Sequence, residues 1–491
     1  MSNEKEIVLN EGQGAALEKI SDFLKDKDSK VFILKGFAGT GKTTMIRKLI
    51  SYMSARQISY GLLASTGRAA KVLGDATDCP AGTIHGEIYR FDGFNSDLKK
   101  LKAGADGRLA DGVQLCIQFD LGHPDEMSPD VYVVDEASMI SDREEKNVVQ
   151  SRFGNGKLLT DLLRYDKTAK FIFVGDPCQL APVTGEPSPA LSPSYFKERF
   201  GIDAEETVLT EVMRQSDGNG IVSAASDVRN LWENAPENEL FYGRVNSWKK
   251  LPFRNVPDIE LLDSVDTLVS RYLDEIRGCN YGKAIFICMS NNGCYNFSLK
   301  FREALGFSGI LQKNELVLVV QNNLISGFRN GDLLKVLSVS PVTEKRAELT
   351  FREVEVQELY TEKKFKQLMI DEILYQPQVN LDSDRQSKLY FDFIMRMRKK
   401  GVPEKSEAFK SFMMSDKYLN ALRVSFGYAL TCHKAQGGEW TNVYACFPRN
   451  IMLNPTKQKY QWVYTAMTRA KEKLFVVDDI YIEGYRNGFG H

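Results

Sequence analysis

The sequence predicts an α/β fold with two lobes, each built around a parallel sheet and each carrying an insertion. Short apolar runs, rich in β-branched and aromatic residues and bounded by turn residues, alternate with amphipathic stretches through residues 15–215. A second alternation follows residue 216 and resumes near the C-terminal end, at 443–447 and 474–477. Buried parallel strands joined by helices are typical of this pattern.

Individual elements follow from the same periodicities. Residues 216–280 are expected to be mainly helical, and the glycine-rich stretch 92–122, around a basic segment at 99–102, to form an inserted hairpin or small subdomain. Strand-like alternation across 332–358 favours a small antiparallel barrel or sheet, whereas the charged, Lys-, Phe- and Met-rich stretch 359–422 is expected to be an inserted helical region. Further strands are expected at 31–35, 60–64, 131–134, 171–174, 284–288 and 315–320.

Composition is that of an ordinary globular protein. The 491 residues include 64 Lys+Arg against 65 Asp+Glu, so no overall basic field indicates a nucleic-acid partner, although a local basic groove remains compatible. No apolar run approaches the ~20 residues of a membrane helix, and the first residues lack the apolar core of a secretory signal. Eight scattered cysteines and four histidines disfavour a disulfide framework and a His-based metal site. We therefore expect a cytoplasmic protein without a membrane partner.

The most informative local pattern is a glycine loop between an apolar run and an amphipathic helix. Glycines let backbone N–H groups surround phosphate oxygens, and the helix N-terminus adds favourable partial charge. Lys42 can reach the β- and γ-phosphates, and the Thr43 hydroxyl can ligate Mg²⁺. An ordinary glycine turn is the disfavoured alternative. The predicted nucleotide-binding residues are Gly36, Ala38, Gly39, Thr40, Gly41, Lys42, Thr43 and Thr44.

Polar side chains at the ends of two later strands complete a hydrolytic pattern. Asp135 and Glu136 follow the apolar run 131–134, where one carboxylate can support Mg²⁺ and the other can orient or deprotonate water. A second buried strand, at 171–174, is followed by Asp176 and Gln179, which are expected at the same edge of the sheet. Gln179 is therefore a candidate γ-phosphate sensor. The alternative is that these residues only form the turn that ends the strand. Gln13, before the first helix, has an amide that can pair with adenine.

Eight segments, taken in order, resemble the motifs of the superfamily 1B helicases, the RecD/Dda-like group. This resemblance spans nearly the whole chain, and 226–230 and 328–336 resemble the Dda branch. It implies two RecA-like lobes with inserted subdomains, including a small SH3-like β-barrel, and ATP-driven 5′-to-3′ movement on single-stranded DNA with duplex unwinding. The matching segments are 36–44, 62–73, 83–85, 133–140, 174–183, 209–215, 428–440 and 464–474.

The resemblance also implies domain boundaries. The first RecA-like lobe would occupy 1–213, with a pin or hairpin inserted at about 89–122. The second lobe would combine 214–340 with 423–491, and a β/helical subdomain would be inserted between them at 341–422.

For the nucleotide, the resemblance implies that Gln13 contacts adenine and that Glu439 lies near the nucleotide. Arg214 and Arg469 would reach the γ-phosphate from the second lobe. The remaining implied roles agree with those argued above: phosphates and Mg²⁺ for Lys42 and Thr43, metal for Asp135, water for Glu136 and phosphate sensing for Gln179.

For DNA, the resemblance implies a set of residues along or near the strand. These are Thr66, Arg68, His85, Thr431, His433 and Gln436. Aromatic side chains can also stack on bases, and Phe91, Phe94 and Trp440 are candidates, with a core position as the commoner alternative.

The favoured function is that of a monomeric DNA helicase using ATP and Mg²⁺ on single strands and single-/double-strand junctions, in replication, recombination or repair, with proteins of those processes as possible partners. An RNA helicase and a protein-stripping translocase are alternatives, since no sequence feature distinguishes RNA from DNA. A nucleotide-gated binding switch is disfavoured by the complete hydrolytic set, and a GTPase by the lack of an Asn-Lys-x-Asp segment.

Overall fold

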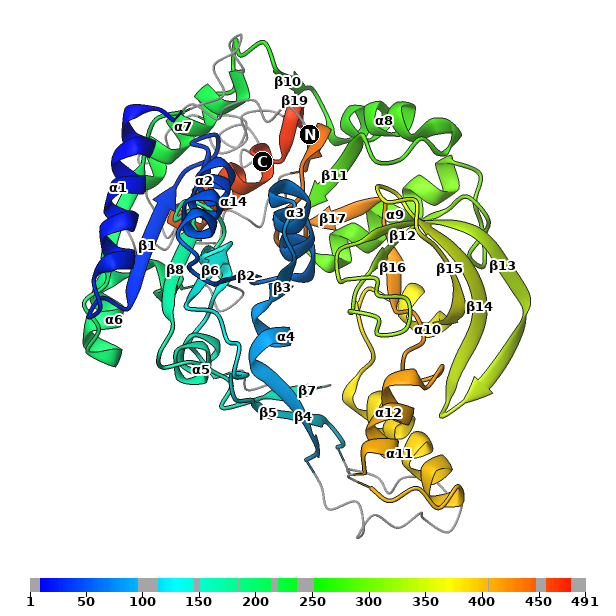
Figure 1. The fold of residues 1–491 in the computed structure, drawn as a ribbon. Coiled ribbons are helices and arrows are strands. Elements are labelled where there is room, and N and C mark those ends of the chain that lie inside the picture. Colours follow the sequence, from blue (N-terminus) through cyan, green and yellow to red (C-terminus); the bar gives the residue numbers. More distant parts are fainter. Residues whose placement is uncertain are drawn as a thin grey trace.

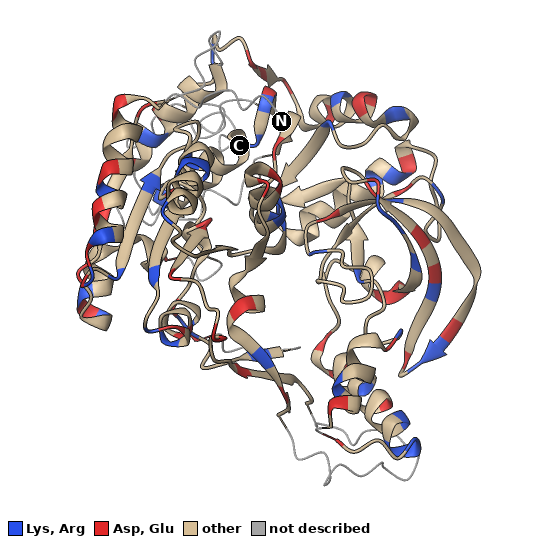
Figure 2. Cartoon of the chain, in the orientation of Figure 1, with Lys and Arg blue, Asp and Glu red and all other residues tan. Residues whose placement is uncertain are grey.

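The computed structural model describes residues 9–95, 114–144, 151–182, 186–212, 220–235, 251–404, 406–446 and 456–477. Four sheets organise these residues, two of them parallel and covered by helices (Figure 1). Basic and acidic side chains are mixed over both lobes, as Figure 2 shows. Within the described ranges, no helix combines the length and the apolar character needed to cross a bilayer.

The first lobe is built on a six-stranded parallel sheet in the order β3-β2-β6-β8-β1-β9, and all four strands predicted for it are confirmed. Alternate residues of β1 enter two apolar cores, Phe32 and Leu34 on one face, Val31 and Ile33 on the other. The strands are β1 (Val31–Gly36), β2 (Tyr60–Ala64), β3 (Ala81–Thr83), β6 (Val131–Asp135), β8 (Lys170–Gly175) and β9 (Glu205–Leu209). The helices are α1 (Glu11–Lys25), α2 (Lys42–Ala55), α3 (Gly67–Thr77), α4 (Ile84–Ile88), α5 (Leu158–Tyr165) and α6 (Pro193–Phe200).

The second lobe has a five-stranded parallel sheet in the order β10-β19-β18-β11-β17, so the two-lobed RecA-like α/β fold is confirmed. The short strand β10 interrupts a region expected to be mainly helical. The strands are β10 (Ile259–Leu262), β11 (Ala284–Cys288), β17 (Ala429–Thr431), β18 (Trp440–Ala445) and β19 (Ala470–Val477). The helices are α7 (Gly220–Glu233), α8 (Val265–Ile276), α9 (Asn291–Ala304), α13 (Cys432–Ala435) and α14 (Thr456–Met467).

A five-stranded sheet of order β15-β14-β13-β12-β16, with antiparallel neighbours, is inserted in the second lobe. One parallel bridge, between Met369 and Leu422, joins its two edges, and in the described residues the sheet is otherwise open, so the predicted barrel is not confirmed. The strands are β12 (Leu316–Val319), β13 (Leu333–Arg346), β14 (Leu349–Glu358), β15 (Lys364–Ile370) and β16 (Val424–Phe426). The sheet therefore takes in strands on both sides of the range 341–422.

The prediction that 359–422 is wholly helical was wrong at its start. Strand β15 occupies Lys364–Ile370 because it pairs along the length of β14, a long-range contact that the charged local sequence does not reveal. Helices follow it: α10 (Asp371–Leu374), α11 (Ser383–Lys399) and α12 (Glu407–Ser415).

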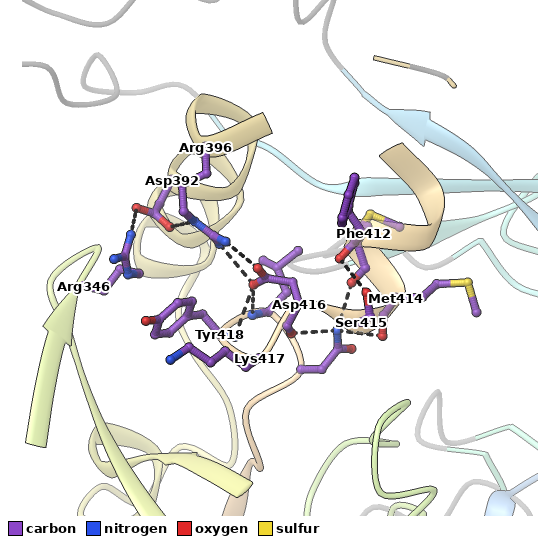
Figure 3. Close-up of polar contacts among 12 residues, drawn as sticks. Arg346, Asp392, Arg396, Phe412, Met414, Ser415, Asp416, Lys417 and Tyr418 are labelled. Atoms are coloured by element: carbon purple, nitrogen blue, oxygen red, sulfur yellow. Dashed lines mark hydrogen bonds and ion pairs between the residues drawn. The ribbon is translucent and has the colours of Figure 1, made fainter. Parts of the chain in front are cut away.

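A polar network attaches α11 to the rest of this insertion (Figure 3). Arg396 on α11 donates through Nε to Asp392 at 2.8 Å and through Nη2 to Asp416 at 3.0 Å, and Asp392 also accepts from Arg346 of β13 at 3.0 Å. Asp416, which ends α12, further accepts the Leu419 N–H at 2.9 Å. Because these pairs are charge-assisted and partly buried, they fix α11 and α12 to the sheet.

The first lobe carries a three-stranded sheet of β4 (Tyr89–Phe94), β5 (Ile117–Leu121) and β7 (Ser151–Phe153). Strands β4 and β5 pair antiparallel, as expected for an inserted hairpin, and the basic segment 99–102 lies outside the described residues. The sheet contacts α11 of the other insertion: the Phe94 ring lies 5.3 Å from that of Tyr390, and the Leu115 N–H donates to the Ser387 hydroxyl at 2.8 Å. The insertions of the two lobes therefore touch.

Phe94 was expected to offer its ring to DNA bases, but the structure packs it in this apolar contact, where it is 9% exposed. We expect Phe94→Ala to lower the free energy of unfolding by about 3 kcal/mol, since buried aromatic side chains typically contribute this much. Thermal melting, with hydrogen exchange of α11 as a local readout, measures the loss. The exposed Phe412→Ala serves as the control. Unchanged melting together with weaker single-strand binding would instead support the base-stacking role.

Candidate nucleotide site and nucleic-acid groove

The predicted phosphate loop forms a tight turn between β1 and α2. Gly39 and Gly41 have φ of 77° and 80°, a left-handed conformation that glycine adopts without strain. The Thr40 hydroxyl donates to the Phe37 carbonyl at 2.8 Å, and Lys42 Nζ donates to the Gly36 carbonyl at 2.7 Å. The loop is therefore compact, and its lysine lies across its mouth at the N-terminus of α2.

Three carboxylates lie at the carboxyl edge of the same sheet, as predicted from their positions after β6 and β8. The Glu136 N–H donates to Asp135 Oδ1 at 2.8 Å, and Asp176 Oδ2 lies 3.8 Å from Lys42 Nζ. Burial raises the pKa of Asp135, Glu136 and Asp176, and the charge of Asp135 adds to the rise at Glu136. The charge of Lys42 opposes each of these rises. Glu136 is held at φ 51°, an uncommon backbone conformation that is concentrated at functional sites.

The donor set beside the loop fits Mg²⁺. The Thr43 side chain is exposed at the start of α2, and Asp135 supplies carboxylate oxygen at the strand end, both of them ligands that hard cations prefer. Among the described residues, no group of three or more His, Cys, Asp or Glu could hold a metal ion by itself. Mg²⁺ usually needs only one or two carboxylates, because substrate phosphates and waters complete its shell.

Two glutamines lie close to the loop in different ways. Gln13 is buried; its Oε1 accepts the Asn10 N–H at 3.2 Å, and its Nε2 donates to the Thr40 carbonyl at 3.1 Å. Gln13 therefore connects α1 to the phosphate loop. The contact of its amide with adenine stays a prediction. Gln179 Oε1 is buried without a hydrogen-bond partner in the described part of the chain, so this oxygen has the capacity to accept a hydrogen bond from a bound group.

Helix α14 of the second lobe lies directly against these loops. The Tyr464 hydroxyl accepts the Ala38 N–H at 2.6 Å and donates to Asp176 at 2.9 Å. The Leu180 N–H donates to the Thr465 hydroxyl at 2.9 Å, and Gln461 donates to the carbonyl of the residue after Asp176 at 3.2 Å. Positions 461, 464 and 465 share one helix face, so a single face of α14 contacts the first lobe.

Arg469 follows α14 and is 6% exposed. Its Nε donates to the Thr465 carbonyl at 3.0 Å and its Nη1 to the Gly438 carbonyl at 3.3 Å. Its charge acts to lower the pKa of Glu136 and Asp176 against the larger effect of burial, so the guanidinium lies within electrostatic reach of both carboxylates. The second lobe thus brings a cation to the site.

Two further nucleotide residues, Arg214 and Glu439, were expected from the second lobe. Arg214 lies outside the described residues. Glu439 is exposed and forms an ion pair with Lys471 at 3.6 Å.

A groove of about 710 Å³ is lined mainly by the first lobe, with His433 from the second lobe, and brings together three of the predicted DNA residues, Thr66, His85 and His433. Among the described residues, five cations also line it, against one carboxylate, that of Glu144. Sequence reasoning missed these cations because they come from separate segments without a local motif. They are Arg143, Arg152, Lys157, Arg164 and Arg199.

Three polar residues of this groove, Thr66, His85 and His433, can contact a ligand without carrying charge. Burial lowers the pKa of His85 to about 4 and also lowers that of His433, so both imidazoles are neutral near pH 7. The His85 ring packs 5.0 Å from Phe153. The Thr66 hydroxyl caps α3 by accepting the Ala69 N–H at 3.2 Å. Positive charge in the groove therefore comes from its Arg and Lys side chains.

The remaining predicted DNA residues are not among those that line the groove, and two of them connect the lobes. Arg68 donates to the Gly331 carbonyl at 3.3 Å, and its guanidinium lies 4.7 Å from the centre of the buried Trp440 ring. Gln436 donates to the carbonyl of Leu180 at 3.3 Å. Thr431 is buried and caps α13. Trp440 therefore packs in the core, where its ring is not open to a base.

The first lobe holds a phosphate loop and buried carboxylates at the edge of a parallel sheet, and the second lobe adds an arginine. This combination defines the class of two-lobed P-loop nucleotide hydrolases. An AAA domain model matches residues 8–231, and a UvrD-like helicase C-terminal domain model matches 426–477. These two matches agree with the resemblance of the chain to the superfamily 1B helicases of the RecD/Dda-like group.

Individual relatives are distant. The ATP-dependent RecD2 DNA helicase of Deinococcus radiodurans is 24% identical over 481 residues, covering 95% of this chain and 48% of that protein, so the chain spans about half of its length. The uncharacterized protein R530 of Acanthamoeba polyphaga mimivirus is 23% identical over 95% of this chain and 99% of its own. A Bacteroides Pif1 helicase in complex with ADP-AlF3 and ssDNA is 15% identical over 97% of this chain and 95% of that chain, with a TM-score of 0.48.

The loop geometry makes a substitution at Gly36 informative. A Cβ there would lie 2.8 Å from the Thr40 hydroxyl oxygen and 2.9 Å from Lys42 Cγ, so Gly36→Ala must displace the loop or its lysine. We expect nucleotide affinity to fall by on the order of tenfold or more, measured by calorimetric titration, with little change in melting temperature. Gly14→Ala is the matched control, since its Cβ would meet nothing within 4 Å on α1. Equal nucleotide affinity in both variants would contradict the assignment of the loop.

Proposed function

We propose that this protein is an ATP-dependent DNA helicase that moves 5′-to-3′ on single-stranded DNA and unwinds duplexes. The observation that carries the proposal is the contact of α14 with the phosphate loop and Asp176, which sets Arg469 within electrostatic reach of Glu136. A nucleotide bound at the loop would therefore interact with both lobes, as a motor requires. The same proposal includes the direction of movement along the strand, a role in replication, recombination or repair, and a monomeric state. It also includes lobe boundaries at 213, 340 and 423.

Hydrolysis follows from the placement of these side chains. The loop and Lys42 hold the ATP phosphates, while Glu136, whose pKa is raised by burial, accepts a proton from water. The water oxygen bonds to the γ-phosphorus as the bond to the ADP oxygen breaks. Mg²⁺, held by Thr43 and Asp135, would supply neutralising charge at the phosphate oxygens. Gln179 senses the γ-phosphate, and Arg469, with Arg214, stabilises the developing charge from the second lobe.

Movement follows because hydrolysis removes a group that both lobes contact. ATP favours close approach of the lobes, and phosphate release relaxes it. If each lobe also binds the strand, alternating grip converts this change into steps. The groove supports such a grip, since Thr66 and His85 of the first lobe and His433 of the second offer neutral contacts beside five cations of the first lobe.

The decisive experiment compares unwinding of duplexes that carry either a 5′ or a 3′ single-stranded tail, with and without ATP. We expect unwinding only with the 5′ tail and ATP. Lys42→Ala should lose hydrolysis by on the order of 10³-fold or more, because the phosphates lose their cation, while single-strand binding without nucleotide persists. A Lys42→Ala protein that still hydrolyses ATP would refute the proposal. ATPase stimulation by RNA instead of DNA oligomers would assign an RNA helicase.

The groove cations should control the electrostatic part of strand binding. We expect Arg152→Ala and Arg164→Ala each to weaken single-strand binding and to reduce the slope of log K against log salt by about 0.7, the value for one lost phosphate contact. Fluorescence anisotropy across a salt series measures both. Lys19→Ala, an exposed residue of α1 outside the groove, is the matched control. Slopes equal to that of the parent protein would remove the groove from the strand path.

A further inference from the structure

The Tyr464 hydroxyl is a polar contact from the second lobe to the phosphate loop, and neither the sequence motifs nor the comparisons give it a role. It lies on α14, is 1% exposed, and uses both of its hydrogen-bonding capacities across the lobe interface. It accepts the Ala38 N–H at 2.6 Å and donates to Asp176 Oδ2 at 2.9 Å. A phenylalanine would keep the ring and lose both contacts.

Its partners connect it to the phosphate site. Asp176 is fully buried, accepts the Cys178 N–H at 3.0 Å through Oδ1, and lies 3.8 Å from Lys42 Nζ through Oδ2, the oxygen that Tyr464 contacts. Lys42 Nζ in turn donates to the Gly36 carbonyl. A shift of the loop therefore moves the Ala38 partner of the Tyr464 hydroxyl, and a shift of the lysine changes the charge beside its Asp176 partner.

Hydrogen bonds also lead from Tyr464 to Arg469. The Thr468 hydroxyl donates to the Tyr464 carbonyl at 2.8 Å and accepts from Arg469 Nη2 at 3.1 Å. Arg469 Nε donates to the carbonyl of Thr465, the residue after Tyr464. Two of the guanidinium contacts are thus set by the last turn of α14 and the residue that follows it, and that turn is anchored to the first lobe through Tyr464.

We propose that Tyr464 is a positioning residue that links the state of the phosphate loop to the placement of Arg469, so that Arg469 engages the γ-phosphate only in one arrangement of loop and helix. This inference rests on the proposed function, because it assigns Arg469 to the hydrolytic step. Coupling of this kind needs a difference in contacts between two states, and a hydroxyl shared by the loop amide and Asp176 supplies it.

The test is Tyr464→Phe in the full chain, assayed for ATP hydrolysis with saturating single-stranded DNA. We expect kcat to fall by on the order of tenfold while KM for ATP changes by less than about twofold, because the loop and Lys42 still bind phosphate but Arg469 is no longer held. Thr468→Ala, which leaves the Tyr464 hydroxyl contacts in place, should give the same separation of kcat from KM. A rise in KM at unchanged kcat would overturn the proposal.

A double-mutant cycle with Arg469→Ala separates positioning from an independent contribution. If Tyr464 acts through Arg469, Tyr464→Phe adds little further loss in the Arg469→Ala background; additive losses would overturn the inference and leave the proposed function intact. Full activity of Arg469→Ala would overturn both. Tyr444→Phe is the matched control, a buried tyrosine of β18 whose hydroxyl donates to Glu275 at 2.7 Å in the second lobe, and it should keep the parent kcat and KM.

Discussion

The constraint on which the structure depends is electrostatic: the terminal phosphate of a nucleotide must be surrounded by donors and cations on every side during transfer. One lobe supplies the loop, Lys42 and the paired carboxylates at the carboxyl edge of its sheet. The opposite side is reached only if a second lobe is held against that edge. Helix α14 does this with directional hydrogen bonds to the loop and to Asp176, and the side chains that make them are buried.

Part of the groove is formed at the same edge of the sheet. Thr66 follows β2, His85 follows β3, and the segment after Gln179 also lines the groove, while the loops between them carry the carboxylates. These loops pack closely: a Cβ on Gly175 would lie 3.0 Å from the Ser138 amide nitrogen. The predicted nucleotide residues and two of the predicted DNA residues, Thr66 and His85, therefore lie on adjoining turns at one edge of the sheet.

Local signals in the sequence were enough for the strands of the first lobe, the phosphate loop and the carboxylates, because each depends on a short run of residues and on the rule that parallel strands end at one edge. Features that depend on distant partners were not predictable in this way. Strand β15 needs its pairing with β14, the groove cations meet from separate segments, and Phe94 is buried by an insertion almost three hundred residues away. The motifs singled out Arg68 as a DNA residue but did not reveal its contact with Trp440.

The lobes touch at several places, and two of these differ clearly in chemistry. At the insertions, the Phe94 ring packs on Tyr390 beside the hydrogen bond from Leu115 to Ser387, and ring packing tolerates small sliding because it is weakly directional. At the nucleotide site, hydrogen bonds with fixed geometry connect α14 to the loop, and a small displacement breaks them. Relative displacement of the lobes is therefore opposed more sharply at the nucleotide site than at the insertions.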